Sequence, residues 1–292
     1  MNFMKALAVS LLIAISPASQ ANQDDYQTSK ISWFEFDAPP YYIFQGVKAN
    51  KGTAQLFQAE IMRQLPQHKH QTQRGNFIRG LKEIENKNNV CATSLLKTPA
   101  YEKFMHFSEP WFEVLAIGLN IRYSELNRFL PAIENGKINL KKLLADTDIK
   151  LGILNGRPYG QPIDETLGDY RHTDRIFTLT GSTKMHNLLH LFIKRKRFDA
   201  VLGYAAETHY YSNQFERDAD ELLYIPIKDT QLMYKAYVGC SKSPMGKSVI
   251  AQVNKLIENT SPKVYEKRYL SFLSPQSQET YKLLKQQLAM NN

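Results

Sequence analysis

The sequence predicts an α/β fold made of two lobes that follow one another along the chain. Strand-like and helix-like segments alternate from residue 31 to the end, which is typical of α/β proteins. The length of 292 residues suits one large domain or two medium ones. With 43% hydrophobic and 22% charged residues, the composition is that of a folded globular protein and argues against disorder.

The first twenty-one residues have the features of a secretory signal peptide. Lys5 lies in a short positive segment, residues 6–16 form an apolar core, and Pro17 interrupts it. Ser19 and Ala21 place small residues at the −3 and −1 positions of a cleavage site. The apolar run is too short to span a bilayer. We therefore expect residues 1–21 to be removed and a soluble protein to be exported. The expected destination is a bacterial periplasm.

The first predicted lobe begins with an aromatic-rich strand, which Pro39 and Pro40 end because proline cannot continue a ladder. Apolar residues at helical spacing predict two helices, and a short apolar strand follows the second one. The expected elements are a strand at 31–36, helices at 54–65 and 77–85, and strands at 90–94 and 111–121.

The second predicted lobe again mixes helices and strands, and the chain ends in a further strand and two helices. Asn155-Gly156 is expected to turn into a helix with Pro158 in its first turn, a position that suits proline. A Ser/Thr cap is expected to open the helix at 182–194. The other expected elements are helices at 138–144 and 205–212, strands at 149–154, 198–202 and 234–240, and helices at 245–258 and 276–289.

The charge pattern gives no indication of a nucleic-acid partner. The net charge of +9 is mild for this length, and its densest run, residues 194–197, is expected to be the solvated end of a helix. His186 and His190 have metal-ligand spacing, but Asn187 stands where a zinc protease needs Glu. We expect these to be helix-surface histidines, His68 and His70 to be exposed, and the protein to use no metal and no cofactor.

Motif searches argue against an enzyme. The chain contains no G-x-S-x-G, no P-loop and no G-x-G-x-x-G. Cys91 and Cys240 have no neighbouring His in sequence, so a thiol nucleophile has no support. An exported protein with two cysteines commonly pairs them, the alternative being two buried free thiols. A disulfide between residues 149 positions apart would return the end of the chain to its beginning.

Several segments resemble family 3 solute-binding proteins, the periplasmic receptors of polar amino acid ABC transporters. The stretch from Lys97 to Trp111 (KTPAYEKFMHFSEPW) resembles the family's "TPER…FS.PY" segment. Leu151–Gly156 (LGILNG) is similar to its "vGv..G" turn, and Arg197–Leu202 (RFDAVL) to its "gr.DAv." strand. Weaker similarities include Pro39–Tyr42, Gly52 before the first helix, Phe77–Glu85 with Asn89-Val90-Cys91, and Tyr237–Lys242.

The resemblance implies a type 2 periplasmic-binding-protein-like fold, in which two α/β lobes are joined by two crossing segments. The crossings would lie near 112–122 and 232–240, which gives lobe 1 residues 22–117 and 235–292, and lobe 2 residues 118–234. Cys91 and Cys240 would then lie in neighbouring strands of lobe 1. A small-molecule ligand would be held between the lobes of a monomer by hinge closure and passed to an ABC permease or a membrane sensor.

Two departures from the family pattern change the expected ligand. Amino-acid-binding members clamp the α-carboxylate with an Arg at the position of Tyr101, and hold the α-ammonium with an acidic residue at the position of Tyr204. Tyrosine supplies neither a fixed charge nor a two-donor fork. An ordinary α-amino acid is therefore not the expected ligand.

The candidate ligand-binding residues combine positions from the resemblance with tyrosines that could stack or donate hydrogen bonds. They are Glu35, Tyr41, Arg74, Ser94, Tyr101, Arg157, Tyr159 and Tyr204. Arg157 is of interest because a helix opening at Asn155-Gly156-Arg157 would favour an anion. Arg74 and Arg157 could instead be surface residues, Tyr41 could pack beside the prolines, and Ser94 could cap its strand.

The sequence thus favours a periplasmic solute-binding protein that captures a small polar ligand for ABC-type uptake. The first alternative keeps the fold but makes the protein a ligand-sensing partner of a membrane receptor. A periplasmic hydrolase on the same scaffold is the second, and it needs a nucleophile and a base converging between the lobes.

Overall fold

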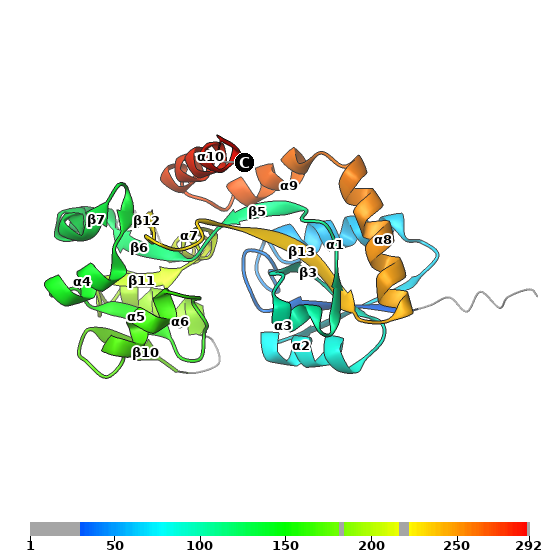
Figure 1. The fold of residues 1–292 in the computed structure, drawn as a ribbon, viewed down its shortest axis with the longest axis horizontal. Helices are drawn as coiled ribbons and strands as arrows, with labels where there is room; N and C mark the ends of the chain where they lie inside the picture. Colours follow the sequence, from blue (N-terminus) through cyan, green and yellow to red (C-terminus); the bar gives the residue numbers. More distant parts are fainter. Residues whose placement is uncertain (1–29, 181–183, 216–221, 291–292) are drawn as a thin grey trace, which may run out of the picture.

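Two β-sheets, one in each lobe, organise the computed structural model (Figure 1). The structure describes residues 30–180, 184–215 and 222–290. The predicted signal peptide and the predicted Ser/Thr cap at 182–183 lie outside these residues. Within the described residues no helix is long and apolar enough to cross a membrane.

The sheet of lobe 1 takes strands from both ends of the chain. Its order is β2 (Lys69–Gly75), β1 (Lys30–Phe36), β3 (Val90–Leu95), β13 (Met233–Ser241) and β4 (Met105–Phe107), and β5 (Phe112–Leu115) pairs with β13. The helices in this first part of the chain are α1 (Thr53–Gln64), α2 (Phe77–Asn86) and the short α3 (Pro99–Glu102). β1, β2 and β3 are parallel, whereas β13 runs antiparallel to β3.

Successive side chains of β1 point to opposite faces of the sheet, so the hydrophobic core of lobe 1 has one part on each face. Trp33 packs in the cluster that contains α1 residues such as Phe57, while Phe34 packs in the cluster that contains Ile84 of α2. Glu35 comes two residues after Trp33, so its side chain points to the same face of the sheet, toward α1. There Gln55 and Gln58 donate hydrogen bonds to its carboxylate.

The sheet of lobe 2 has the order β10 (Ile176–Leu179), β9 (Leu151–Leu154), β11 (Ala200–Gly203), β6 (Gly118–Arg122) and β12 (Leu222–Pro226). Its helices are α4 (Leu140–Asp146), α5 (Ile163–Tyr170), α6 (Lys184–Ile193) and α7 (Ala205–Ser212). A small ribbon of β7 (Ile133–Glu134) and β8 (Lys137–Ile138) and two 3₁₀ turns, Tyr123–Arg128 and Leu130–Ala132, complete the lobe.

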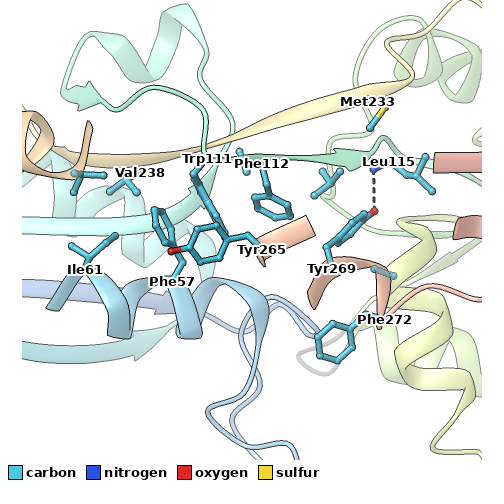
Figure 2. Close-up of a cluster of buried hydrophobic side chains, with 14 of the residues drawn as sticks. Phe57, Ile61, Trp111, Phe112, Leu115, Met233, Val238, Tyr265, Tyr269 and Phe272 are labelled. Carbon is cyan, nitrogen blue, oxygen red and sulfur yellow. Dashed lines mark hydrogen bonds between the residues drawn. The ribbon is translucent and has the colours of Figure 1, made fainter. Parts of the chain in front are cut away.

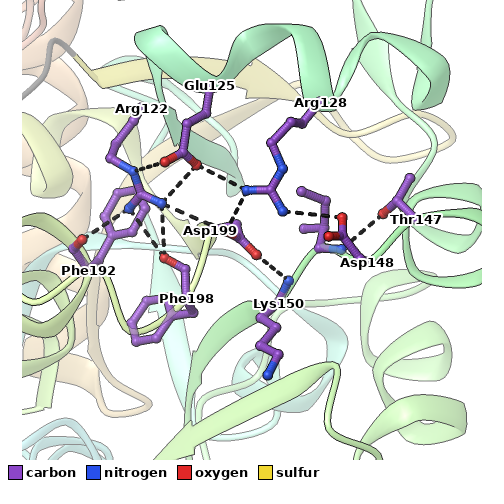
Figure 3. Close-up of polar contacts among 10 residues, drawn as sticks. Arg122, Glu125, Arg128, Thr147, Asp148, Lys150, Phe192, Phe198 and Asp199 are labelled. Atoms are coloured by element: carbon purple, nitrogen blue, oxygen red, sulfur yellow. Dashed lines mark hydrogen bonds and ion pairs between the residues drawn. The ribbon is translucent and has the colours of Figure 1, made fainter.

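An ion-pair network ties β6 to the neighbouring turns of lobe 2 (Figure 3). The buried Arg122 guanidinium donates to the Glu125 carboxylate at 2.9 Å and to the carbonyl oxygens of Phe192 and Phe198. Arg128 joins Asp199 at 2.7 Å. Phe192 and Phe198 lie on either side of the exposed residues 194–197. Because Arg122 donates hydrogen bonds to the carbonyl oxygens of both, this network fixes the turn between α6 and β11. The expectation that residues 194–197 are solvated at a helix end is confirmed.

The two lobes are connected by strands that lie side by side. Only Ala116 and Ile117 separate β5 in lobe 1 from β6 in lobe 2, so the single strand expected at 111–121 is in fact two strands in two sheets. On the return, the Ala116 N–H donates to the Leu232 carbonyl at 3.0 Å, just before β13 begins. β13 pairs first with β5 and then with β3 and β4. We call the β5–β13 pair the hinge ribbon.

Three C-terminal helices pack beside the hinge ribbon: α8 (Pro244–Asn259), α9 (Pro262–Leu270) and α10 (Pro275–Met290) (Figure 1). Helix α9 was not predicted, because its exposed face is rich in Lys and Arg and its apolar stripe consists of tyrosines. Tyr265 and Tyr269 of α9 insert into the core next to Trp111 and Phe112, and the Tyr269 hydroxyl accepts a hydrogen bond from the Leu115 N–H at 3.0 Å (Figure 2).

Strand β2 was also missed, because its sequence KHQTQRG contains no apolar residue. It is the outermost strand of the sheet and pairs with β1 in parallel, so backbone hydrogen bonds rather than burial place it. The expectation that His68 and His70 are exposed is wrong, since both are half-buried. His70 accepts a hydrogen bond from the Trp33 indole N–H at 3.0 Å.

The predicted helix at Asn155-Gly156-Arg157 is wrong. After β9 the chain makes a turn at Asn155-Gly156, with Gly156 at φ 70°, and continues without regular structure until α5 begins at Ile163. A left-handed glycine directs the chain away from a helix at this point. Arg157 therefore lies in a turn and not at a helix N-terminus, so the anion-site reasoning based on a helix dipole does not hold.

The expected disulfide is present and joins Cys91 to Cys240. The two residues are register partners on β3 and β13, in the middle of the lobe 1 sheet. Both side chains are buried. The bond therefore holds the last strand of the chain against one of its early strands, as the spacing of the cysteines suggested.

We predict that replacing both cysteines, Cys91→Ala with Cys240→Ala, lowers the free energy of unfolding by about 2–5 kcal/mol, because the loop of 149 residues is no longer closed in the unfolded chain. Denaturant titration of the variant and the parent measures this difference. Thiol titration of the unreduced, denatured parent should find no free thiol, and two reactive thiols would show that the bond does not form.

Candidate functional site

The lobes meet at a cluster of tyrosines that surrounds one arginine and one glutamate. We call this the interlobe cluster; its members are Tyr41, Arg157, Tyr159, Tyr204, Glu207 and Tyr269. Tyr41 belongs to the turn after β1 and Tyr269 to α9, whereas the other four come from the turn after β9 and from the start of α7.

The central feature of the cluster is a two-pronged ion pair within lobe 2. Arg157 Nη2 lies 3.0 Å from Glu207 Oε2, and Nη1 lies 3.3 Å from Oε1. Both side chains are mostly buried, with 18% and 12% of their surface exposed. Burial lowers the pKa of the Arg157 guanidinium, but the Glu207 carboxylate together with Tyr159 and Tyr204 raises it by more, so the net shift is upward and the arginine stays charged. Each charge is thus already committed to the other.

Two tyrosine rings flank the guanidinium. Arg157 Cζ lies 5.4 Å from the centre of the Tyr204 ring and 5.8 Å from that of Tyr159, within cation–π range. The Tyr159 hydroxyl accepts a hydrogen bond from the Leu154 N–H at 2.8 Å, which holds that ring in place. Burial raises the pKa of Tyr204 to about 12, so its hydroxyl is neutral and able to donate at physiological pH.

Tyr41 carries the contact from lobe 1 to this group. Its ring meets that of Tyr204 edge to face, with centroids 6.3 Å apart, and stacks on that of Tyr269 at 6.4 Å. The Tyr41 hydroxyl is buried and faces Tyr269 without a hydrogen bond of normal geometry. A buried hydroxyl of this kind is a donor that a ligand or a water molecule could satisfy.

Glu35 and Arg74, two further candidates, are brought together in lobe 1. Arg74 Nε donates to Glu35 Oε2 at 3.0 Å, and the Arg74 guanidinium also stacks on Phe44 and bonds Asn50. Since Glu35 also accepts bonds from Gln55 and Gln58, its carboxylate is fully used within the lobe. The structure therefore gives both residues a structural partner.

Ser94 and Tyr101 lie in lobe 1. Ser94, the next-to-last residue of β3, has a positive φ of 57°, and its buried hydroxyl has no hydrogen-bond partner. Tyr101 lies in the short α3 and packs edge to face against Phe77 and Phe104. Burial raises the pKa of Tyr101, which keeps its hydroxyl neutral. Ser94 therefore offers an unsatisfied donor, and Tyr101 offers an uncharged side chain.

Glu207 and Tyr269 are the members of the cluster that sequence reasoning missed. The expected acidic position was Tyr204, but the acidic side chain comes three residues later, in the first turn of α7. The helix that follows β11 places positions 204 and 207 on one side, because residues three apart are neighbours on a helix. An acidic residue in the first turn after the "DAV" strand was thus a usable sequence signal.

Two histidines of lobe 2, His186 and His190, pack against aromatic side chains. His186 packs against Tyr211 and Phe215, and His190 packs against Phe215. In the ranges that the structure describes, no group of three or more His, Cys, Asp or Glu side chains is arranged to hold a metal ion.

No protein-family model matches this chain, and a search of curated proteins found no match. Solved structures do match over most of its length. An amino acid ABC transporter substrate-binding protein from Streptococcus pneumoniae, bound to L-arginine, superimposes with a TM-score of 0.58 at 15% identity, covering 84% of this chain and 94% of that one.

Two other solved structures with the same fold are a ligand-binding core and a sensor domain. The GluR0 ligand-binding core in complex with L-glutamate gives a TM-score of 0.57 at 15% identity, over 85% of this chain and 98% of that one. A histidine kinase sensor domain with similarity to periplasmic binding proteins gives 0.59 at 11% identity, over 86% and 100%. At these identities the likeness shows the fold, and it confirms the two-lobe α/β architecture expected from the sequence.

We predict that Arg157→Met lowers the free energy of unfolding by about 3–5 kcal/mol, because it leaves the Glu207 carboxylate buried without its partner. The double variant Arg157→Met with Glu207→Leu should lose clearly less, since no charge is left unpaired. Arg63→Met is the control: its pair with Glu60 is exposed, with 68% of the arginine surface accessible, so losing it should leave the free energy of unfolding nearly unchanged. Equal losses in the Arg157 and Arg63 variants would contradict the assignment.

A second pair of variants tests two lobe 1 tyrosines of the interlobe cluster, Tyr41 and Tyr269. Tyr269→Phe removes the acceptor of the buried Leu115 N–H and should cost about 1–3 kcal/mol in unfolding free energy. Tyr41→Phe removes a buried hydroxyl that has no partner and should be neutral or stabilising. Thermal or denaturant unfolding of both variants measures the contrast, and a larger loss in Tyr41→Phe would refute it.

Proposed function

We propose that this protein is a periplasmic solute-binding protein that captures a small polar ligand between its two lobes by hinge closure. The observation that carries the proposal is the interlobe cluster, which lies where the two lobes meet. The lobes are joined by two adjacent strands, β5 and β13. Such a connection lets the lobes rotate about a short hinge while each core stays intact. The fold is shared with a substrate-binding protein and with a sensor domain.

Closure requires contacts that exist only when both lobes touch the ligand. Tyr41 and Ser94 of lobe 1 carry buried hydroxyl groups without partners, and Tyr204 and Arg157 of lobe 2 present a ring and a guanidinium. We assign the ligand-binding role to these four residues first, with Tyr101 and Tyr159 beside them. Glu35 and Arg74 serve instead to stabilise lobe 1, because their charges are used there.

An ordinary α-amino acid is not the proposed ligand. Tyr101 and Tyr204 replace the charged clamp that the resemblance leads one to expect, and the one arginine in the cluster is held by Glu207. A ligand that used Arg157 would have to compete with a buried two-pronged ion pair. A neutral or weakly charged planar ligand, which stacks on tyrosine rings and accepts hydroxyl hydrogen bonds, avoids that competition.

The proposed site of action is the periplasm, after removal of residues 1–21. Lobe 1 would comprise residues 22–117 and 235–292, and lobe 2 residues 118–234. The monomer would deliver its ligand to an ABC permease.

The alternative, a ligand-sensing partner of a membrane receptor, is favoured by the match to a histidine kinase sensor domain. Cross-linking in intact cells distinguishes the two, because the trapped partner is a permease subunit in one case and a receptor in the other.

We predict that the purified chain is stabilised by a subset of a broad panel of small polar metabolites. Stabilisation should follow RT ln(1 + [L]/Kd), which is about 2.7 kcal/mol at a ligand concentration a hundred times Kd. Thermal unfolding over the panel measures this. We expect the standard α-amino acids to bind this site weakly compared with the best planar ligands.

The matched variants are Tyr204→Ala, which removes a ring of the interlobe cluster, and Tyr123→Ala, which removes an exposed ring elsewhere in lobe 2. Ligand-induced stabilisation should disappear in the first and persist in the second. A silent panel, or equal responses in the two variants, would count against the proposal.

A further inference from the structure

Helix α10 contacts both lobes, although the chain reaches it from α9 in lobe 1 (Figure 1). Its first turn lies against β12, the outermost strand of the lobe 2 sheet. Its middle packs against α9, beside the hinge ribbon. One helix therefore bridges the two lobes in addition to the two strands that cross between them.

The contact with lobe 2 is made by Gln276, whose side-chain amide pairs with the backbone of one residue of β12. The Tyr224 N–H donates to Gln276 Oε1 at 3.3 Å, and Gln276 Nε2 donates to the Tyr224 carbonyl at 3.2 Å. A side-chain amide carries an acceptor and a donor, which match the C=O and N–H groups that an outermost strand leaves open. Gln276 Nε2 also donates to Thr280 Oγ1 at 3.0 Å, so its own helix orients the amide.

Tyr224 is in turn bound to the hinge. Its hydroxyl donates to the Ala116 carbonyl at 2.9 Å, and its ring belongs to the same buried cluster as Tyr269 and Tyr281. Ala116 lies between β5 and β6, where the chain first passes from lobe 1 to lobe 2. Rotation of lobe 2 about this point therefore moves β12 relative to α9.

The contact with lobe 1 comes later on α10, at Tyr281 and Lys285. Tyr281 is buried, and its ring centre lies 5.6 Å from that of Tyr269 on α9. Lys285 Nζ pairs with Glu266 Oε2 of α9 at 2.7 Å. The part of the helix from Gln276 to Lys285 is about 14 Å long. Because a hydrogen-bonded helix does not stretch, a change in the angle between the lobes has to break contacts at one of its ends.

We propose that α10 is a strap that holds the lobes in the orientation of this structure and limits their rotation about the hinge ribbon. Gln276 is its anchor on lobe 2, and Tyr281 with Lys285 is its anchor on lobe 1. The contact between Tyr41 and Tyr204, which needs the lobes at this angle, is made while both anchors are in place. Loss of either anchor releases the strap and widens the range of lobe orientations that the free protein samples.

The test is the distribution of distances between two spin labels in the full chain without ligand, measured by pulsed electron paramagnetic resonance. Lys51→Cys in lobe 1 and Lys141→Cys in lobe 2 supply one exposed thiol each, because the native cysteines are bonded to each other. In this background Gln276→Ala should broaden the distribution, since it removes both hydrogen bonds to Tyr224. An unchanged distribution in the folded variant would overturn the proposal.

Gln278→Ala is the matched control. Gln278 lies in the same part of α10 as Gln276, but its amide donates to the Leu273 carbonyl at 3.2 Å, within the C-terminal segment. The distance distribution of this variant should equal that of the parent. Equal broadening in Gln278→Ala and Gln276→Ala would contradict the strap, because the effect would then come from a general loosening of the helix.

Release of the other anchor tests whether α10 acts on both lobes or only covers β12. Lys285→Glu places a second carboxylate opposite Glu266, and it should broaden the distribution as Gln276→Ala does. Broadening in Gln276→Ala alone would refute the strap, because α10 would then act from lobe 2 only.

Thermal unfolding shows whether each variant is folded. If Gln276→Ala is not, Gln276→Glu takes its place, because glutamate keeps the size of the side chain but its carboxylate cannot donate to the Tyr224 carbonyl. The same broadening is expected, and its absence counts against the strap in the same way. No ligand is added in any of these measurements, so their outcome is independent of the proposed function.

Discussion

The return of β13 into the first sheet is the constraint on which the rest of the structure depends. Without it, lobe 1 would lack the strand that lies between β3 and β4, and only one segment of the chain would connect lobe 2 to lobe 1. The strand is secured in three ways: by its pairing with β5, by the disulfide between Cys91 and Cys240, and by α9, whose Tyr269 binds the Leu115 N–H of the facing hinge strand. These contacts also place the two crossings side by side, which is what makes a hinge possible.

The charged groups where the lobes meet are arranged differently from what the sequence positions suggested. Tyr101 and Tyr204, which the sequence analysis placed at the two clamp positions, are both uncharged. Lobe 2 nevertheless holds one of each charge, Arg157 and Glu207, and they neutralise one another. A cluster with an internal ion pair and several neutral tyrosines has little net charge to offer. Its chemistry is that of stacking and hydroxyl hydrogen bonds.

Much of the fold could be predicted because its helices and central strands carry clear apolar periodicity. The helix expected at 205–212 matches α7, and the two long C-terminal helices differ by one residue at their ends. The misses share a physical cause, since β2 is placed by backbone pairing and α9 by tyrosines among Lys and Arg. The site was harder, because Glu35 with Arg74, and Arg157 with Glu207, are pairs whose members lie 39 and 50 positions apart in sequence. The sequence pattern indicated Glu35, Arg74 and Arg157 as single residues, but it did not show that Glu35 pairs with Arg74 or that Arg157 pairs with Glu207.

The most direct test of the account is the distance between the lobes with and without ligand. Lys82→Cys on α2 and Glu165→Cys on α5 give one exposed thiol in each lobe for spin labelling, and the native cysteines do not react because they are bonded to each other. Pulsed electron paramagnetic resonance then measures the distribution of distances before and after addition of a metabolite mixture. The account predicts that ligand shifts the distribution to a shorter, narrower distance, and that Tyr204→Ala abolishes the shift. A distribution that stays the same in every mixture would contradict closure of the lobes on a ligand.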